Sequence, residues 1–237
     1  MRVGIIQSSF IPWRGCFDFI ASVDLFVFHD DIQYTKGDWR NRNRIKTAAG
    51  VAWLTVPVSY KKVSQKICET PIVYSKACAA RHSRIWRESY QNAPFVDVTN
   101  EILFALQPAE KDLTISEFNI RLIRGVCSYL GITTRLALSS EFDAQGTKTD
   151  RLIDILTKAG ATTYLSGPSA DGYLDKEMFR SNGIQLEYKT YDYAPYPQLW
   201  GDFVGEVTVL DLIANCGPQS RSLITSRSPD VVVASRS

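Results

Sequence analysis

The chain has 237 residues, of which 45% are hydrophobic and 22% are charged, and its formal net charge at neutral pH is +2. This composition is typical of a globular protein that buries a sizeable core, and it excludes collagen-like, coiled-coil and wholly disordered chains. The near balance of charge argues against a protein that coats nucleic acid. No apolar run reaches the length of about 18 residues that indicates a membrane span. The five cysteines are never spaced as C-x-x-C, so we expect a cytoplasmic protein without a cysteine metal site.

The first 30 residues have the pattern of a βαβ unit. Residues 3–6 predict a buried strand, and Pro12 and Gly15 mark the turn that follows it. Residues 17–22 predict a short helix, and residues 24–29 predict a second buried strand. Two strands joined by a helix within about 30 residues are expected to be parallel.

The middle of the chain is less regular. We expect residues 36–66 to leave the sheet as a basic surface loop and an edge strand. Within this segment, residues 51–58 predict the strand, and Pro57 places its end at a sheet edge. Residues 76–92 have a weak helical pattern.

Two helix–strand pairs follow. Thr114-Ile-Ser-Glu117 is a capping box, and the helical spacing behind it continues to Leu130, where Gly131 ends the helix. Residues 132–138 predict a strand, residues 147–159 a helix and residues 162–165 another strand. The alternation predicts an α/β fold with an open, mostly parallel sheet and helices on both faces, of the Rossmann-like or nucleotidyltransferase-like kind.

The C-terminal part completes this predicted domain. We expect residues 191–205 to form an extended, packed loop and residues 207–214 to form a last helix. Residues 1–217 are then a single α/β domain, and residues 218–237, rich in Ser and Arg, are predicted to be a poorly ordered tail.

Polar residues follow four of the predicted strands. Ligands of open parallel sheets bind at the carboxyl ends of the strands. Any one of these ends is equally consistent with a strand that finishes in a polar turn, but together they indicate one shared site. The four groups are Gln7-Ser8-Ser9, Asp30-Asp31, Ser139-Ser140 and Ser166-Gly167-Pro168-Ser169.

The acidic pair has two interpretations. Asp30 and Asp31 are either a catalytic base with a Mg²⁺ ligand, because Mg²⁺ needs only one or two protein carboxylates, or a strand-end turn. Successive strand residues point to opposite faces, so only one of the two is expected to face the site. The other is expected to cap a turn or to pair with a neighbouring cation such as Lys36 or Arg44.

The basic stretch from Lys36 to Lys46 has the most unusual composition in the chain. It places five cations against one carboxylate, with Trp39, Asn41 and Asn43 between them. Arginine binds phosphate in a bidentate manner, and tryptophan offers a stacking face for a base or a sugar. The alternative is a solvated charged loop. Residues 167–172 are a further candidate anion site, although they are not a P-loop, since no Gly-Lys-Ser/Thr follows.

Several motifs resemble the WbqC-like family. They are Gln7-x-x-Phe10-x-Pro12-Trp13-x-Gly15-x-Phe17, Asp30-Asp31-x-Gln33-Tyr34, Trp39-x-Asn41-Arg42-Asn43-Arg44-Ile-Lys46, Trp53-Leu-Thr-Val-Pro57, Lys148-Thr149-x-Arg151, Tyr164-Leu-Ser166-Gly167 and Tyr173-Leu-Asp175. The resemblance covers residues 2–217. Two departures are Ser8, where the family usually has proline, and Ala170-Asp171-Gly172, which varies its glycine-rich loop.

The resemblance implies a role in bacterial O-antigen and other surface-polysaccharide synthesis. It implies a transferase that moves a glycyl or other acyl group onto the amine of a nucleotide-linked amino sugar. The donor is then aminoacyl-tRNA, acyl-CoA, or ATP with a free amino acid and Mg²⁺. The alternative is a non-catalytic protein that binds the sugar nucleotide or glycan carrier, and either form is compatible with a homo-oligomer.

We therefore assign candidate residues to two groups. The candidate catalytic residues are Gln7, Asp30 and Asp31, of which Asp30 and Asp31 are also the candidate Mg²⁺ ligands. The candidate substrate-binding residues are Trp13, Gln33, Lys36, Trp39, Asn41, Arg42, Asn43, Arg44, Lys46, Ser140, Lys148, Ser166, Gly167 and Tyr173.

The order of the first elements is similar, more weakly, to the opening of adenylyl-transferring α/β enzymes such as pantothenate synthetase. The histidine pair that those enzymes carry in the first turn is replaced here by Trp13 and Cys16. This replacement argues against adenylyl transfer by that route.

Overall fold

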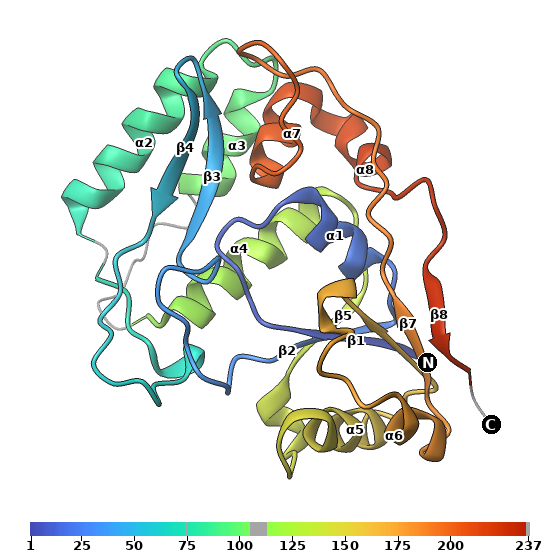
Figure 1. The fold of residues 1–237 in the computed structure, drawn as a ribbon. Coiled ribbons are helices and arrows are strands. Elements are labelled where there is room, and N and C mark those ends of the chain that lie inside the picture. Colours follow the sequence, from blue (N-terminus) through green and yellow to red (C-terminus); the bar gives the residue numbers. More distant parts are fainter. Residues whose placement is uncertain (74, 105–112, 236–237) are drawn as a thin grey trace.

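Figure 1 shows the fold in a computed structural model that describes residues 1–73, 75–104 and 113–235. The strands are β1 (Arg2–Ile6), β2 (Leu25–Phe28), β3 (Arg42–Thr47), β4 (Gly50–Thr55), β5 (Arg135–Leu138), β6 (Thr163–Ser166), β7 (Gln185–Tyr188) and β8 (Val231–Ala234). The α-helices are α1 (Arg14–Ala21), α2 (Lys76–Tyr90), α3 (Val96–Phe104), α4 (Ile115–Tyr129), α5 (Lys148–Lys158), α6 (Lys176–Ser181), α7 (Val209–Cys216) and α8 (Ser220–Leu223). Short 3₁₀ turns are η1 (Ile67–Glu69), η2 (Ser139–Phe142), η3 (Pro168–Ala170) and η4 (Gly217–Gln219). Among the helices of the described residues, none combines the length and the apolar character needed to cross a membrane.

The main sheet has the strand order β5-β2-β1-β6-β7-β8. The pairs β5–β2, β2–β1, β1–β6 and β6–β7 are parallel, whereas β8 runs antiparallel to β7. From β1 the chain first builds outward through β2 to β5, and then returns to the other side of β1 to build β6 and β7. The predicted open, mostly parallel α/β sheet is confirmed.

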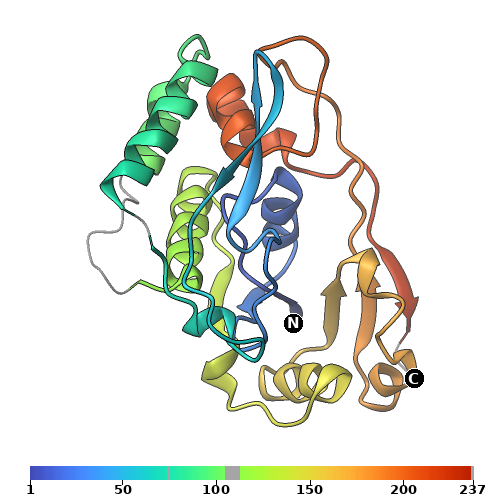
Figure 2. The same ribbon diagram turned by 60° about the vertical axis from the view of Figure 1, so that its left-hand side comes forward.

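Helices cover both faces of this sheet, as predicted. Figures 1 and 2 show α1 and α4 on one face and α5 and α6 on the other. The alternation of β2 explains the two layers: Phe26 and Phe28 belong to the core with α1 and α4, and Leu25 and Val27 belong to the core with α5 and α6. Because both faces are covered, β2 is a continuous apolar run rather than an alternating one.

The basic segment is a correction to the prediction. Residues 42–47 form strand β3 rather than a loop, and β3 pairs antiparallel with β4 in a separate hairpin. The hairpin stands beside α2 and α7 (Figure 1). The strand was hidden by polarity, because two of its three buried positions, Asn43 and Lys46, are polar and only Ile45 is apolar. Strand β4 also ends at Thr55, before the predicted end at residue 58.

The C-terminal segment is a second correction. The predicted tail, residues 218–237, contains most of η4 and all of α8 and β8, and residues 236–237 lie outside the described residues. The carboxylate of Asp230 is 3.2 Å from the Lys189 ammonium and 2.6 Å from the Arg2 guanidinium. These ion pairs hold the start of β8 against the sheet. The sequence also did not predict α3, α6 or β7, since short segments carry little periodicity.

The remaining predicted elements are present with shifted ends. Helix α4 begins behind Thr114, whose hydroxyl accepts a hydrogen bond from the Glu117 amide, as the capping box predicted. Residues 191–205 contain neither helix nor strand, and α7 follows them. Helix α1 begins at Arg14, before the predicted residue 17.

Gly4 allows α1 to pack directly on β1, which suggests a test of the fold. A Cβ at residue 4 would overlap the ring of Phe19, a fully buried side chain that has no room to move. We expect Gly4→Ala to lower the free energy of unfolding by about 1–3 kcal/mol. Gly125→Ala in α4, where an added Cβ meets nothing within 4 Å, is the matched control and should raise stability by up to about 1 kcal/mol. Equal urea midpoints for the two variants would contradict this packing.

Candidate functional site

The carboxyl ends of four neighbouring parallel strands lie along one edge of the sheet. In spatial order these are β5, β2, β1 and β6, and the residues that follow or end them are Ser139, Asp31, Gln7 and Ser166. Between β1 and β6 the chain connections leave in opposite directions, and in open α/β sheets ligands bind outside the strand ends at such a switch point. The structure thus brings the four predicted polar strand ends to one edge, with Gln7 and Ser166 at the switch point.

Asp30 connects three segments at this edge. Its side chain is 3% exposed. One carboxylate oxygen accepts a hydrogen bond from the Ser8 amide at 2.8 Å, and the other accepts one from the hydroxyl of Ser116 in the first turn of α4. The Asp30 carbonyl accepts a further bond from the Cys68 amide at 2.9 Å. Both carboxylate oxygens are occupied, so Asp30 positions the loops around the site.

Asp31 is held by a different set of partners. Its carboxylate accepts hydrogen bonds from the Ser139 hydroxyl and from the guanidinium of Arg151 in α5. Asp31 pairs with a cation, and this cation is Arg151 rather than Lys36 or Arg44. Burial alone would raise the pKa of Asp31, but the Ser139 hydrogen bond and the charge of Arg151 outweigh burial and hold the pKa below its usual value. A carboxylate held ionised in this way is a weak base.

His29 is a candidate that the sequence analysis missed. It directly follows β2, and its Nε2 lies 3.8 Å from an Asp31 carboxylate oxygen. This Nε2 is buried and has no hydrogen-bond partner among the described residues. Burial lowers the pKa of His29 despite the opposing charge of Asp31, so the imidazole is neutral at pH 7 and able to accept a proton. The sequence feature that could have identified His29 is its position between a buried strand and the acidic pair.

The donor set does not fit the predicted Mg²⁺. Asp30 uses both oxygens for N–H and O–H donors, and Asp31 is neutralised by Arg151. Within the described ranges, no three His, Cys, Asp or Glu side chains are grouped as metal ligands.

A buried arginine joins the hairpin segment to the switch point. Arg40, 9% exposed, donates to the Gln7 side-chain oxygen at 3.4 Å. The Arg40 carbonyl accepts a hydrogen bond from the side-chain amide of Asn119 at 2.8 Å. The sequence analysis did not select Arg40 or Asn119, and in the structure they fix the position of Gln7 relative to α4.

Part of the basic stretch is structural. The side-chain amide of Asn41 donates to the Val56 carbonyl at 2.9 Å, and that of Asn43 donates to the carbonyls of Phe10 and Ile11. The ammonium of Lys46 donates to Gln198 at 3.2 Å and to carbonyls of the loop at residues 201–202. These three side chains are buried and fasten the hairpin, so we do not include them in the site.

The other predicted residues of the stretch remain at the surface. Trp39 is 40% exposed and Lys36 is exposed, and Arg42 and Arg44 are partly buried. The structure therefore divides the basic stretch, predicted to bind phosphate and a base or sugar, into a buried structural set and a second set that solvent reaches.

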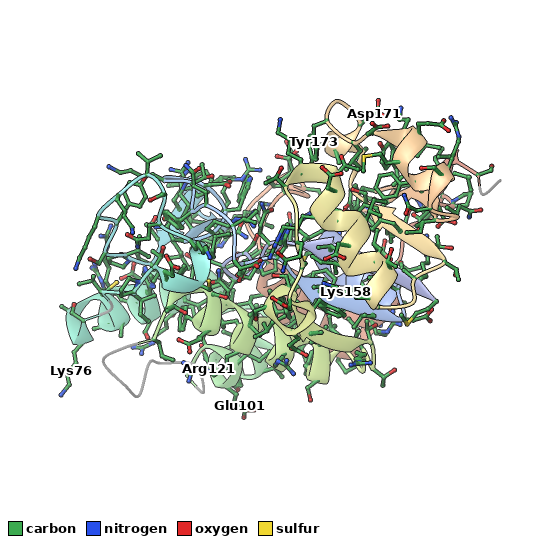
Figure 3. The ribbon with its side chains drawn as sticks, turned by 90° about the horizontal axis from the view of Figure 1, so that it is seen from below. Lys76, Glu101, Arg121, Lys158, Asp171 and Tyr173 are labelled. Carbon is green, nitrogen blue, oxygen red and sulfur yellow. The ribbon has the colours of Figure 1, made fainter. Side chains whose placement is uncertain are left out.

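The remaining predicted residues are dispersed. Trp13 packs against Tyr191, with ring centroids 5.2 Å apart. Gln33, Ser140 and Lys148 are exposed on separate segments, and Gly167 precedes η3. Tyr173 is 69% exposed, and Figure 3 shows it with Asp171 at the periphery of the molecule.

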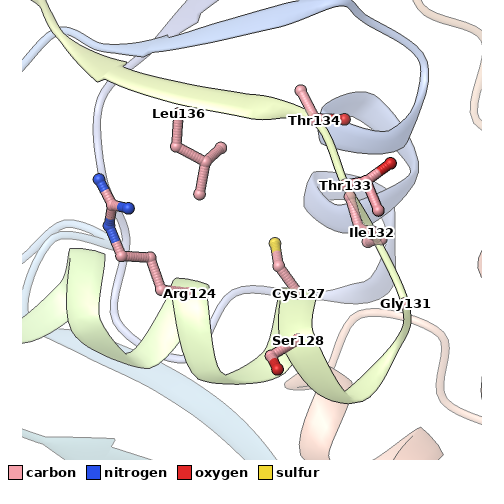
Figure 4. Close-up of a pocket in the computed structure, with 8 residues that line it drawn as sticks. All are labelled: Arg124, Cys127, Ser128, Gly131, Ile132, Thr133, Thr134 and Leu136. Atoms are coloured by element: carbon pink, nitrogen blue, oxygen red, sulfur yellow. The ribbon is translucent and has the colours of Figure 1, made fainter.

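A pocket lies near the start of β5, at the opposite end of the strand from Ser139. It has a volume of about 430 Å³, and its lining residues come from the end of α4, the following turn and β5: Arg124, Cys127, Ser128, Gly131, Ile132, Thr133, Thr134 and Leu136. The Cys127 sulfur points into it (Figure 4), but burial raises the pKa of this thiol to about 12. A protonated thiol is a poor nucleophile, so Cys127 is not a candidate nucleophile at neutral pH.

The strand order and the polar edge define a Rossmann-type α/β protein with a candidate site at the β1–β6 switch point. Residues 7–223 match the model of the WbqC-like protein family, and the chain belongs to this family. It is 44% identical over 221 residues to "Uncharacterized protein Rv1507c" of Mycobacterium tuberculosis, an alignment that covers 92% of this chain and 95% of that protein. No solved structure matches the chain.

The environment of Asp31 predicts a pH-dependent contribution to stability. Because its folded pKa lies below the unfolded value of about 4, ionised Asp31 stabilises the fold above that pH, and the contribution is lost as the pH falls through the folded pKa. We expect Asp31→Asn to lower the free energy of unfolding by about 1–3 kcal/mol at pH 7, the scale for a hydrogen bond to a charged group. The difference from the natural protein should shrink below pH 4.

Urea unfolding across the pH range measures this difference. Asp202→Asn, at an exposed position, is the control and should show a small, constant difference. A difference for Asp31→Asn that does not change with pH would contradict the assigned environment.

Proposed function

We propose that this protein is a cytoplasmic transferase of bacterial surface-polysaccharide (O-antigen) biosynthesis. It would move a glycyl or other acyl group onto the amine of a nucleotide-linked amino sugar. The observation that carries the proposal is the buried, neutral imidazole of His29, whose Nε2 has no hydrogen-bond partner among the described residues and lies 3.8 Å from the ionised Asp31, next to the switch point of the sheet. Family membership and the polar strand ends support it.

The proposed reaction forms an amide. The amine nitrogen of the sugar attacks the carbonyl carbon of the acyl donor, a C–N bond forms, and the bond from the acyl carbon to the leaving group breaks. The nitrogen must lose a proton, which His29 accepts, and the leaving group leaves with the electron pair of the broken bond. Asp31 stabilises the protonated imidazole, since its carboxylate lies 3.8 Å from Nε2.

Other residues of the edge position the substrates. Gln7, held by Arg40, offers an amide group to the sugar. Ser166 and Gly167, at the end of β6, lie on the other side of the switch point and would bind the acyl donor. Asp30, fully occupied by Ser8 and Ser116, holds the surrounding loops.

The donor belongs to one of three chemical classes. It is an aminoacyl-tRNA ester, an acyl-CoA thioester, or an acyl-adenylate made from ATP, with its Mg²⁺, and a free amino acid. Each presents an acyl carbon with a good leaving group, so the same base serves all three.

A second candidate function is a non-catalytic protein that binds the sugar nucleotide or a glycan carrier. The observation that favours it is the full occupation of both aspartates by partners within the chain. Such a protein would need only the binding groups of the edge and the hairpin.

The two functions are separated by product formation. The purified protein is incubated with a nucleotide-linked amino sugar and one donor class in each of three parallel reactions. The mass of the sugar nucleotide is then measured by mass spectrometry. A mass gain equal to the acyl group in one arm supports the transferase. Saturable binding of the sugar nucleotide without a mass gain in any arm leaves the binding protein as the function.

His29 should determine the pH profile of the transfer. We expect His29→Gln to lower turnover by a factor of about 10²–10⁴, the usual contribution of a general base, while the affinity for the sugar nucleotide is kept. Burial holds the pKa of His29 below 6.5. The activity of the natural protein should therefore increase as the pH is raised through this acidic range, and it should reach a plateau at neutral pH.

Glu177→Gln on α6, where the carboxylate is exposed and pairs with Arg180, is the control for a general loss of activity. Turnover of His29→Gln equal to that of the control would remove His29 from the reaction.

A further inference from the structure

One face of the β3–β4 hairpin carries arginine and tryptophan side chains at the surface. Arg42 and Arg44 alternate along β3, and Trp53 lies opposite Arg44 on β4. Trp39, which precedes β3, packs against Trp53 with ring centroids 5.3 Å apart and planes tilted by 40°. Both indoles are large apolar groups left open to solvent, with Trp39 40% and Trp53 43% exposed. We refer to Trp39, Arg42, Arg44 and Trp53 as the Arg/Trp face.

The two guanidinium groups stack on these indoles. The Arg42 guanidinium lies 4.4 Å from the Trp53 ring centroid, and that of Arg44 lies 5.5 Å from Trp39 and 5.9 Å from Trp53. Stacking fixes the guanidinium planes and leaves their N–H edges available for hydrogen bonds. The buried Nε atoms of both arginines have no partner among the described residues.

The charge of the face is uneven. Arg44 pairs with Glu206. No carboxylate of the described residues forms an ion pair with Arg42, whose guanidinium end lies beside Gly37. Arg42 is therefore the cation that is free for an external anion, and exposed Lys36 precedes it in the same segment.

The face adjoins the switch point of the sheet. The Trp39 carbonyl accepts a hydrogen bond from the Phe10 amide at 3.0 Å, within the loop that follows β1. The next residue, Arg40, binds Gln7. A molecule bound on the Arg/Trp face therefore lies beside the residues that we place at the sugar.

We propose that the Arg/Trp face binds the nucleoside diphosphate part of the substrate. The base stacks on the exposed indoles of Trp53 and Trp39, and a phosphate binds Arg42. Aromatic faces and arginine forks are the groups that recognise bases and phosphates without requiring a cavity. The inference rests on the proposed function only for the identity of the attached sugar, because nucleotide binding needs no chemistry at His29.

A structural role would produce a similar picture. Cross-strand arginine and tryptophan pairs stabilise a hairpin by themselves. The two roles differ in one respect: a stabilising pair needs no ligand, whereas a binding face loses affinity when either the ring or the free cation is removed and the fold is kept.

Equilibrium binding tests the proposal with three probes: a nucleoside diphosphate (UDP, ADP and GDP in turn), the matching nucleoside, and inorganic pyrophosphate. We expect saturable binding of at least one nucleoside diphosphate by calorimetry, with quenching of tryptophan fluorescence. The nucleoside and pyrophosphate should each bind at least about tenfold more weakly, since each lacks one half of the recognised group.

Variants of the face identify the contacts. Arg42→Ala and Trp53→Leu should each weaken the nucleoside diphosphate by about tenfold or more, the scale of a lost charge-assisted hydrogen bond or base stack. Trp53→Phe keeps a ring and should retain part of the affinity even if Trp53→Leu unfolds. Controls are Val51→Ala, an exposed apolar position on the same strand, and Arg180→Ala on α6.

The possible outcomes are distinct. Unchanged nucleoside diphosphate affinity in folded Arg42→Ala and Trp53→Phe overturns the proposal and leaves a structural hairpin pair. The proposal is also overturned if these two variants lose affinity for a short single-stranded RNA while their affinity for the nucleoside diphosphate is unchanged. If nucleotide binding requires the Arg/Trp face but no acyl transfer is detected, the proposal is supported and the transferase function is contradicted. If acyl transfer is detected and the variants of the face bind the nucleotide normally, the transferase function is supported and the proposal is contradicted.

Discussion

The buried carboxylate of Asp30 is the interaction on which the candidate site depends. Asp30 lies just after β2, and its carboxylate accepts hydrogen bonds from the loop after β1 and from the first turn of α4. The backbone carbonyl of Asp30 accepts a hydrogen bond from Cys68 in η1. A carboxylate removed from water must have its oxygens satisfied, and here backbone and hydroxyl donors do so. The strand ends, α4 and the segment leading back from the hairpin are thereby held at one edge of the sheet.

The neighbouring residues divide the chemistry of this edge. Asp30 is structural, Asp31 is kept ionised by Ser139 and Arg151, and His29 keeps a neutral imidazole beside it. Both pKa values are lowered, that of His29 by burial and that of Asp31 by the Ser139 hydrogen bond and the charge of Arg151, and adjacent groups with perturbed pKa values are typical of functional sites. The chemical centre that we propose is therefore a histidine–carboxylate pair and not the acidic pair.

Much of the sheet was predictable, because apolar runs such as Leu25–Phe28 and the capping box at Thr114 report their structure locally. The β3–β4 hairpin and β8 were not. In β3 the buried positions include Asn43, whose polarity is satisfied by carbonyls of Phe10 and Ile11, so its burial leaves no hydrophobic trace in the sequence. Strand β8 is held by charges of Arg2 and Lys189, far away in the chain.

The sequence by itself determined the class of fold, the family and the sheet edge where polar residues gather, because these follow from periodicity, strand ends and motifs along the chain. Only the tertiary structure decided what each polar side chain does there. Arg151 is 120 residues from Asp31, and Arg42 and Trp53 come together through strand pairing. Burial, partner and protonation are properties of the three-dimensional neighbourhood, and residues distant in sequence supply that neighbourhood.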